Sequence, residues 1–125
     1  MIKSRVSLRP TNNPSIRSVF DGDRYIGRLV KQNDISFVVK SRELIQRCGG
    51  FGVIPPIVNC KKIKYIIFIY QNRKYSITRE KFLEVGKIYH LGEIEKICVP
   101  ISYFNCEDDA SEPTLFDNTE AEGKL

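Results

Sequence analysis

The chain has 125 residues and a net charge of +5, and it is 42% hydrophobic and 28% charged; this is typical of one folded domain and excludes a wholly disordered protein. Its longest apolar or aromatic run, Tyr65 to Tyr70, is far shorter than the roughly 20 residues that cross a bilayer, so we expect no transmembrane helix and no membrane partner. The amino terminus lacks the apolar segment of a secretory signal and the four cysteines form no C-x-x-C pair, which predicts a cytoplasmic protein with reduced thiols.

The charge is unevenly distributed along the chain. Residues 107–125 hold seven acidic side chains and one basic side chain, a net charge of −6, so residues 1–106 carry +11. A body this basic attracts polyanions, because neutralising phosphates releases condensed counterions. We therefore predict a basic β-rich domain over residues 1–106, an acidic disordered tail over residues 107–125, and nucleic acid as the leading partner. The alternative is that scattered cations only keep the protein soluble.

The first segment alternates between apolar residues and cations from residue 2 to residue 9, which predicts a strand with one basic face. A stretch rich in Pro and Asn follows and favours turns, so the alternative is a flexible basic arm over residues 1–15. The cations of this segment that we assign to phosphate contacts are Lys3, Arg5 and Arg9.

Residues 16–40 read as three strands of a meander, with turns at Asp21-Gly22 and at residues 32–34. Strict alternation in the middle strand places Arg24 and Arg28 on one face. We expect them to form a phosphate-facing pair, although a solvated strand face has the same pattern.

Residues 41–56 change in character. Ser41 can cap a short helix that runs to Arg47 or Cys48, and Gly49 is well placed to end it in a left-handed conformation. The glycines of "GGFG" do not match a phosphate-binding loop and are followed by Pro55-Pro56 rather than by a helix. We assign them to a turn, with Phe51 in the core; the alternative is that Phe51 is exposed and stacks on a base.

The clearest strand signal spans residues 63–78. A strand from Ile63 to Tyr70 reaches a turn and returns as a second strand over residues 75–78, and the first of these is apolar on both faces, which predicts a central buried strand. Its ends are basic and interleaved with tyrosines, a pattern typical of folds that hold single-stranded nucleic acid, although tyrosines also pack in cores. The cations assigned to phosphate here are Lys61, Lys62, Lys64, Arg73 and Lys74.

The last part of the body predicts a short helix that Gly86 ends, then strands with a turn at Leu91-Gly92 and a bulge or edge at Pro100. Short regular strands, few helices and no βαβ rhythm together define the expected fold class. It is mainly β: a small barrel-like or sandwich domain of short antiparallel strands with one or two short helices.

Catalytic and metal-binding signals are weak. The single histidine, His90, has no nucleophile placed beside it by the sequence. The four cysteines, with or without His90, lack the short chelating pairs of structural zinc sites. Carboxylates such as Glu80 and Glu84 are interspersed with lysines, which favours a solvated face. We therefore predict a non-enzyme with no cofactor and no metal.

The tail admits three roles: a solubilising appendage, an internal competitor for the basic surface, or a peptide ligand for another protein. In "EPTLF", Leu115 and Phe116 form an adjacent bulky apolar pair within a polar stretch. The segment resembles the peptide by which partners bind the bacterial sliding clamp, which ends in a similar Leu-Phe pair. It departs from that pattern at Glu112, where glutamine is usual, and at Pro113, where an aliphatic residue is usual.

Two functional hypotheses follow. The first is a non-catalytic nucleic-acid-binding accessory protein whose basic β surface contacts phosphates with little sequence preference. The second is a protein-interaction module, an adaptor or inhibitor within a nucleoprotein complex, that binds its partner through an edge strand or through Leu115 and Phe116.

Overall fold

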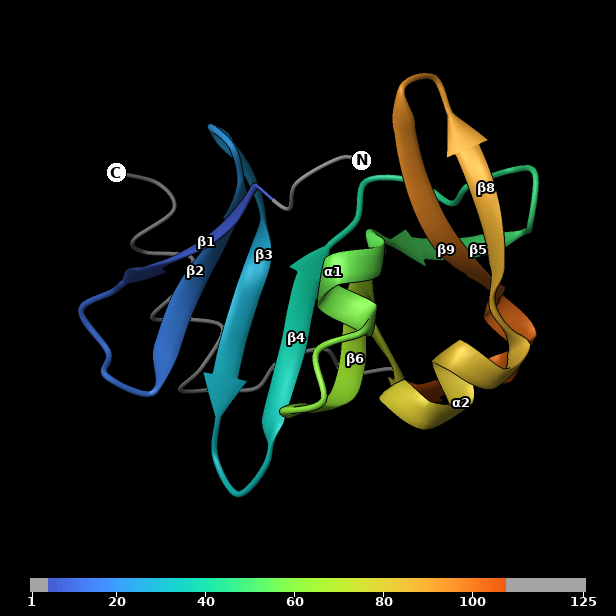
Figure 1. The fold of residues 1–125 in the computed structure, drawn as a ribbon. Helices are drawn as coiled ribbons and strands as arrows, with labels where there is room; N and C mark the ends of the chain where they lie inside the picture. The colour runs from blue at the N-terminus through green and yellow to red at the C-terminus, as the bar shows by residue number, and fades with distance from the viewer. Residues whose placement is uncertain (1–4, 108–125) are drawn as a thin grey trace.

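The computed structural model describes residues 5–107, and the fold is mainly β, as predicted. One sheet has seven strands in the order β1-β2-β3-β4-β6-β7-β10, and a second has three in the order β5-β9-β8 (Figure 1). The strands of the large sheet are β1 (Val6–Pro10), β2 (Ile16–Asp21), β3 (Arg24–Lys31), β4 (Ile35–Lys40), β6 (Ile63–Tyr70), β7 (Arg73–Thr78) and β10 (Asn105–Glu107). Those of the small sheet are β5 (Gly50–Val53), β8 (Lys87–Leu91) and β9 (Ile94–Pro100).

The predicted meander and hairpins are confirmed. Strands β2, β3 and β4 pair antiparallel in chain order, and β1 pairs with β2, so Val6–Pro10 is a strand. Gln71 and Asn72 join β6 to β7 at φ values of 50° and 61°. A two-residue turn with positive φ at both positions matches the twist of the strands that it joins.

One neighbouring pair differs from the antiparallel arrangement that the sequence predicts. Strands β4 and β6 are parallel, with Val38 opposite Ile67. Parallel neighbours need a long crossover, and residues 41–62 supply it by adding β5 to the small sheet and then forming helix α1 (Pro55–Val58).

Three local predictions in this crossover were wrong. Residues 41–48 form turns rather than a helix, because Ile45 pairs with Gly50 in an isolated bridge and closes a loop, although Gly49 does adopt the expected positive φ of 65°. Of the "GGFG" segment, Gly49 lies in a turn as predicted, but Gly50, Phe51 and Gly52 belong to strand β5. A Cβ on Gly50 would overlap the Val99 carbonyl, so this glycine lets β5 approach β9. Pro55-Pro56 begins α1, since proline fits the first helical turn.

Helix α2 (Arg79–Val85) lies where the sequence predicts a helix. The Thr78 side chain caps it by accepting a hydrogen bond from the Lys81 amide at 3.1 Å, and Gly86 ends it. A 3₁₀ helix, η1 (Ile101–Tyr103), joins β9 to β10. None of the helices that the structure describes is long and apolar enough to cross a membrane.

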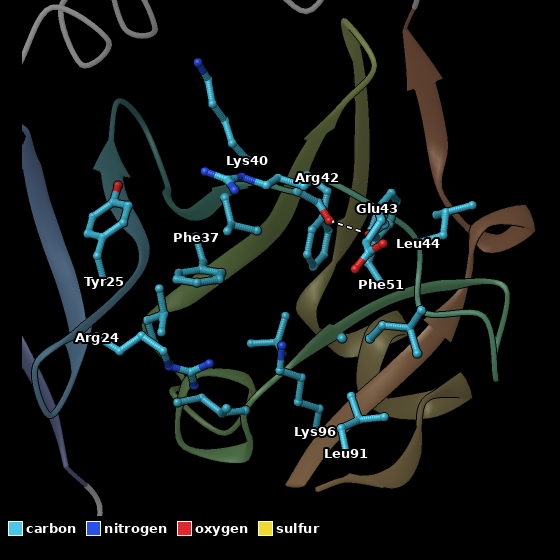
Figure 2. A pocket seen from close by; sticks show the side chains of 18 of the residues that line it. Arg24, Tyr25, Phe37, Lys40, Arg42, Glu43, Leu44, Phe51, Leu91 and Lys96 are labelled. Carbon is cyan, nitrogen blue, oxygen red and sulfur yellow. Dashed lines mark hydrogen bonds between the residues drawn. The ribbon is translucent and has the colours of Figure 1, made fainter. Parts of the chain in front are cut away.

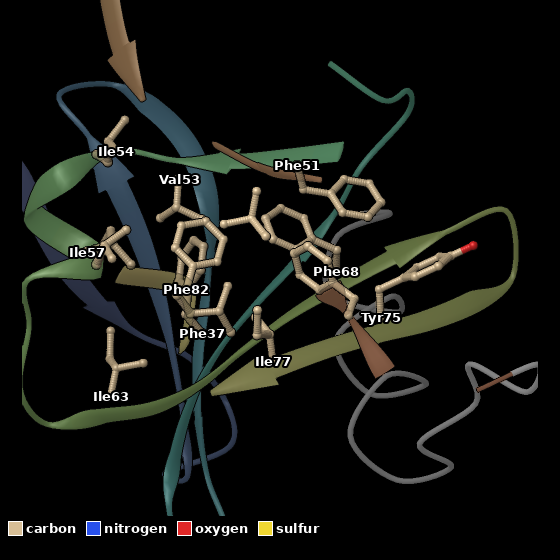
Figure 3. Close-up of a cluster of buried hydrophobic side chains, with 14 of the residues drawn as sticks. Phe37, Phe51, Val53, Ile54, Ile57, Ile63, Phe68, Tyr75, Ile77 and Phe82 are labelled. Atoms are coloured by element: carbon tan, nitrogen blue, oxygen red, sulfur yellow. The ribbon is translucent and has the colours of Figure 1, made fainter. Parts of the chain in front are cut away.

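The two sheets share one hydrophobic core (Figure 3). Phe51 of β5 stacks on Phe68 of β6 with ring centroids 4.5 Å apart, and Phe82 of α2 is fully buried in the same cluster. The core therefore lies on one face of the seven-stranded sheet, which we call the inner face. The opposite, outer face carries a second, smaller cluster of buried side chains with partly buried neighbours: Ile16, Val30, Val38, Ile67 and Ile69.

Candidate nucleic-acid interface

A cleft of about 1050 Å³ opens between β3, the end of β4, and the β5 and β9 strands of the small sheet (Figure 2). Four cations line it, Arg24, Lys40, Arg42 and Lys96, together with a single carboxylate, Glu43. These five charged side chains sum to +3, and the concave walls of a cleft focus such a field. We call this site the basic cleft.

The topology brings these cations together from distant parts of the sequence. Because β3 and β4 are antiparallel, with Arg28 opposite Val38, the start of β3 lies beside the end of β4. Arg24 therefore lies near Lys40 and Arg42. Strand β9 then contributes Lys96 from the other sheet.

Lys96 and Arg24 reach into the basic cleft from opposite sides (Figure 2). Burial lowers the pKa of Lys96 below its ordinary value, and the nearby Arg24 guanidinium lowers it further. Arg24 itself donates to the Asp21 carboxylate at 3.3 Å in an exposed ion pair. An anion between Lys96 and Arg24 would relieve their repulsion, which makes this part of the cleft suited to a phosphate.

Aromatic side chains also line the basic cleft. Phe37 and Phe51 are buried and form its floor, whereas Tyr25 is 48% exposed at the rim. Tyr25 packs edge-on against Phe20 with centroids 5.6 Å apart, which holds the ring in place while one side remains accessible. A fixed and accessible aromatic ring beside cations provides a surface on which a base can stack.

The predicted phosphate-binding residues are spread over the molecule rather than gathered into one surface. Lys61, Lys62 and Lys64 lie at the beginning of β6, where Lys64 is 3.8 Å from Asp34. Arg73 and Lys74 follow the far end of the same strand. Strand β6 has eight residues, so seven steps of about 3.3 Å separate its two ends, roughly 23 Å.

The prediction for Arg28 was wrong with respect to exposure. Its side chain is only 4% exposed, and it lies on the outer face with Val30 and Val38 instead of beside Arg24.

A β-bulge explains the error. Two consecutive residues of β2, Val19 and Phe20, pair with Gly27 and Tyr25 of β3, so Ile26 is an extra residue in the ladder. An extra residue reverses which face the following side chains occupy. Strict alternation therefore fails in this strand, and Arg24 and Arg28 project from opposite faces.

Two further predicted cations lie on or next to β1. Arg5 is exposed and its guanidinium lies against Gly22. The Arg9 guanidinium lies 3.8 Å from the centroid of the Phe20 ring, a cation–π contact. The predicted sites at Lys3, Leu115 and Phe116, and the predicted disorder of residues 108–125, lie outside the described residues.

Of the four cations that line the basic cleft, Arg24 was predicted from the sequence to contact phosphate, whereas Lys40, Arg42 and Lys96 were not. Lys40 and Arg42 flank the end of a predicted strand, a position that often carries binding residues. Lys96 is a lone cation in a run of mostly apolar residues, where burial and a perturbed pKa are expected. Both signals are present in the sequence, but only the fold shows that they meet.

The other reactive side chains are dispersed. Burial, followed by the nearby Cys48, raises the pKa of the Cys98 thiol to about 12, which keeps it protonated. His90 is 75% exposed, with Nε2 3.9 Å from Glu95. Within residues 5–107, no three His, Cys, Asp or Glu side chains are close enough together to hold a metal ion.

Comparison of the chain with protein-family models, with curated proteins and with solved structures finds no match.

Proposed function

We propose that the protein is a non-catalytic nucleic-acid-binding accessory protein that holds a single-stranded segment in the basic cleft. The observation that carries this proposal is the cleft of about 1050 Å³ that combines four cations with an exposed aromatic ring. Its volume is at the upper end for small-ligand sites, enough for one or two nucleotides. The four free cysteines suit a reducing compartment, so we place this binding in the cytoplasm.

The side chains of the basic cleft make two kinds of contact in this proposal. Arg24, Arg42 and Lys96 bind backbone phosphates, with a phosphate replacing Asp21 as the partner of Arg24. Tyr25 stacks on a base. Both kinds of contact tolerate any base, because phosphates carry no sequence information and every base has a π face. Binding with little sequence preference follows.

Fluorescence anisotropy with labelled single- and double-stranded DNA and RNA at low salt tests the proposal. Arg24→Gln/Arg42→Gln should weaken binding of single strands by about tenfold or more, because two phosphate contacts are lost. Lys61→Gln/Lys62→Gln removes the same amount of charge just before β6, at residues that do not line the basic cleft. This control variant should change the affinity by only about twofold. Equal losses of affinity in both variants would show that the net charge of the protein, and not the basic cleft, accounts for binding. Absence of binding by the native protein at low salt would overturn the proposal.

A second candidate function, capture of a partner protein at a sheet edge, is favoured by an exposed apolar surface. Strand β8 pairs only with β9 among the described strands, and its Ile88 is 59% exposed. Leu83 of the adjoining α2 is also exposed. An extended peptide can add to such an edge. Ile88→Lys would abolish capture of a partner at this edge and would leave nucleic-acid binding intact.

A further inference from the structure

We propose that Cys48 and Cys98 form a redox-responsive pair, which a hydroperoxide converts into a reversible disulfide between the crossover and β9. Cys48 lies in the turn of residues 46–49, and Cys98 lies in β9, some fifty residues later in the chain. The two thiols carry this chemistry whether or not the basic cleft binds nucleic acid.

The fold brings the two thiols together around Ile45. The Cys48 thiol donates to the Ile45 carbonyl at 3.7 Å. A Cβ placed on Gly52 would lie 2.7 Å from the Cys98 sulfur and 2.9 Å from the Ile45 Cδ1 atom, so these two atoms lie over the same glycine. The thiols of Cys48 and Cys98 also share a hydrogen bond. Two sulfurs in contact need only a small shift to reach the bonded separation of about 2.05 Å.

The two thiols differ in their access to an oxidant. Cys98 is 1% exposed, and its raised pKa keeps it protonated, whereas the thiolate is the form that reacts. Cys48 is half-buried in its turn, between the exposed residues Arg47 and Gly49. A peroxide therefore meets Cys48 first, and Cys98 is placed to act as the resolving thiol.

Oxidation proceeds in two balanced steps. The Cys48 thiolate attacks one oxygen of hydrogen peroxide, the O–O bond breaks, and Cys48 becomes a sulfenic acid while the departing hydroxide takes up the proton that the thiol lost. The Cys98 sulfur then attacks the Cys48 sulfur, the S–S bond forms, the S–O bond breaks, and the departing hydroxide leaves as water with the Cys98 proton. The two thiols lose two electrons, and the peroxide is reduced to two molecules of water. A dithiol reverses the reaction by exchange.

The disulfide would join two walls of the basic cleft. Residues 41–46 line the cleft from the crossover, and Lys96 lines it from β9, two residues before Cys98. Lys96 and Cys98 lie on the same face of β9, because alternate residues of a strand share a face. Oxidation would thus limit the movement of these two walls relative to each other.

Treatment of the reduced full-length protein with hydrogen peroxide at neutral pH tests the pair. The remaining thiols are blocked with N-ethylmaleimide, the protein is digested without reductant, and linked peptides are identified by mass spectrometry. The main product should link Cys48 to Cys98 within one chain, and dithiothreitol should remove the link. In Cys98→Ser, Cys48 should instead remain a sulfenic acid that dimedone traps. The matched control Cys60→Ser, at a thiol that follows α1, should retain the link.

Three results would overturn the proposal. The first is peroxide oxidation of the native protein that leaves Cys48 and Cys98 unlinked. The second is a link between two chains, which a non-reducing gel would show as a dimer. The third is the same mixture of cysteine pairs in the native protein as in protein unfolded in urea, because the fold would then not select this pair. All three are read from the native sequence, so they hold even if Cys98→Ser fails to fold.

Discussion

Replacing one cation of the basic cleft should change the salt dependence of binding by a calculable amount. For a single strand, the slope of log K against log salt concentration falls by about 0.7 for each phosphate neutralised. With Arg24, Arg42 and Lys96 bound to phosphates, the native slope should be about −2.1. Affinity should then fall about 18-fold between 50 and 200 mM salt. Arg42→Gln should reduce the slope to about −1.4 and the loss to about sevenfold.

The assay is fluorescence anisotropy of a labelled single-stranded oligonucleotide, titrated at several salt concentrations. Lys62→Gln serves as the control, because it removes one charge at the beginning of β6, away from the basic cleft. Its slope should equal that of the native protein. The assignment of phosphates to the cleft would be refuted if Lys62→Gln made the slope as shallow as Arg42→Gln does. It would also be refuted if Arg42→Gln left the slope unchanged.

Three further predictions concern stability, pH and thiol reactivity. Phe51→Ala should destabilise the fold by about 3–5 kcal/mol, because the stack with Phe68 joins the two sheets; urea unfolding measures this, and a loss under about 1 kcal/mol would contradict it. Because the pKa of Lys96 is lowered, the affinity for the oligonucleotide should begin to fall, as the pH rises, at a lower pH than it would with a lysine of ordinary pKa, and binding should take up protons. Lys96→Arg should remove this pH dependence. If the dependence persisted in that variant, Lys96 would be excluded as its source. Exposed Cys106 should react with a thiol reagent at pH 8 well before Cys98, which is buried with its pKa raised to about 12; early labelling of Cys98, mapped by mass spectrometry, would show that the site opens.

Strands and tight turns could be predicted from the sequence because their signals are local. Asp21-Gly22 and the alternation around it mark a hairpin within a few residues. Helix α2 likewise carries its own cap at Thr78 and its own end at Gly86. The central position of β6 followed from its apolar composition on both faces, and the structure places β4 and β7 on either side of it.

The features that the sequence did not predict depend on contacts between distant segments. The bulge at Ile26 is defined by pairing with β2, and it moves Arg28 to the outer face. Strand β5 exists because Gly50 allows its backbone close to Val99, some fifty residues later in the chain. The basic cleft needs the ends of β3 and β4 beside β9, and no local pattern specifies that arrangement.

Photo-crosslinking of a single-stranded oligonucleotide to the full-length protein, with the crosslinked peptide identified by mass spectrometry, tests the central claim most directly. A photoreactive base should label Tyr25 or its immediate neighbours, because that ring is exposed at the rim of the basic cleft. Labelling should disappear in Arg24→Gln/Arg42→Gln at moderate salt. Crosslinks confined to the segment around Lys61 and Lys62, or none at low salt, would contradict the account.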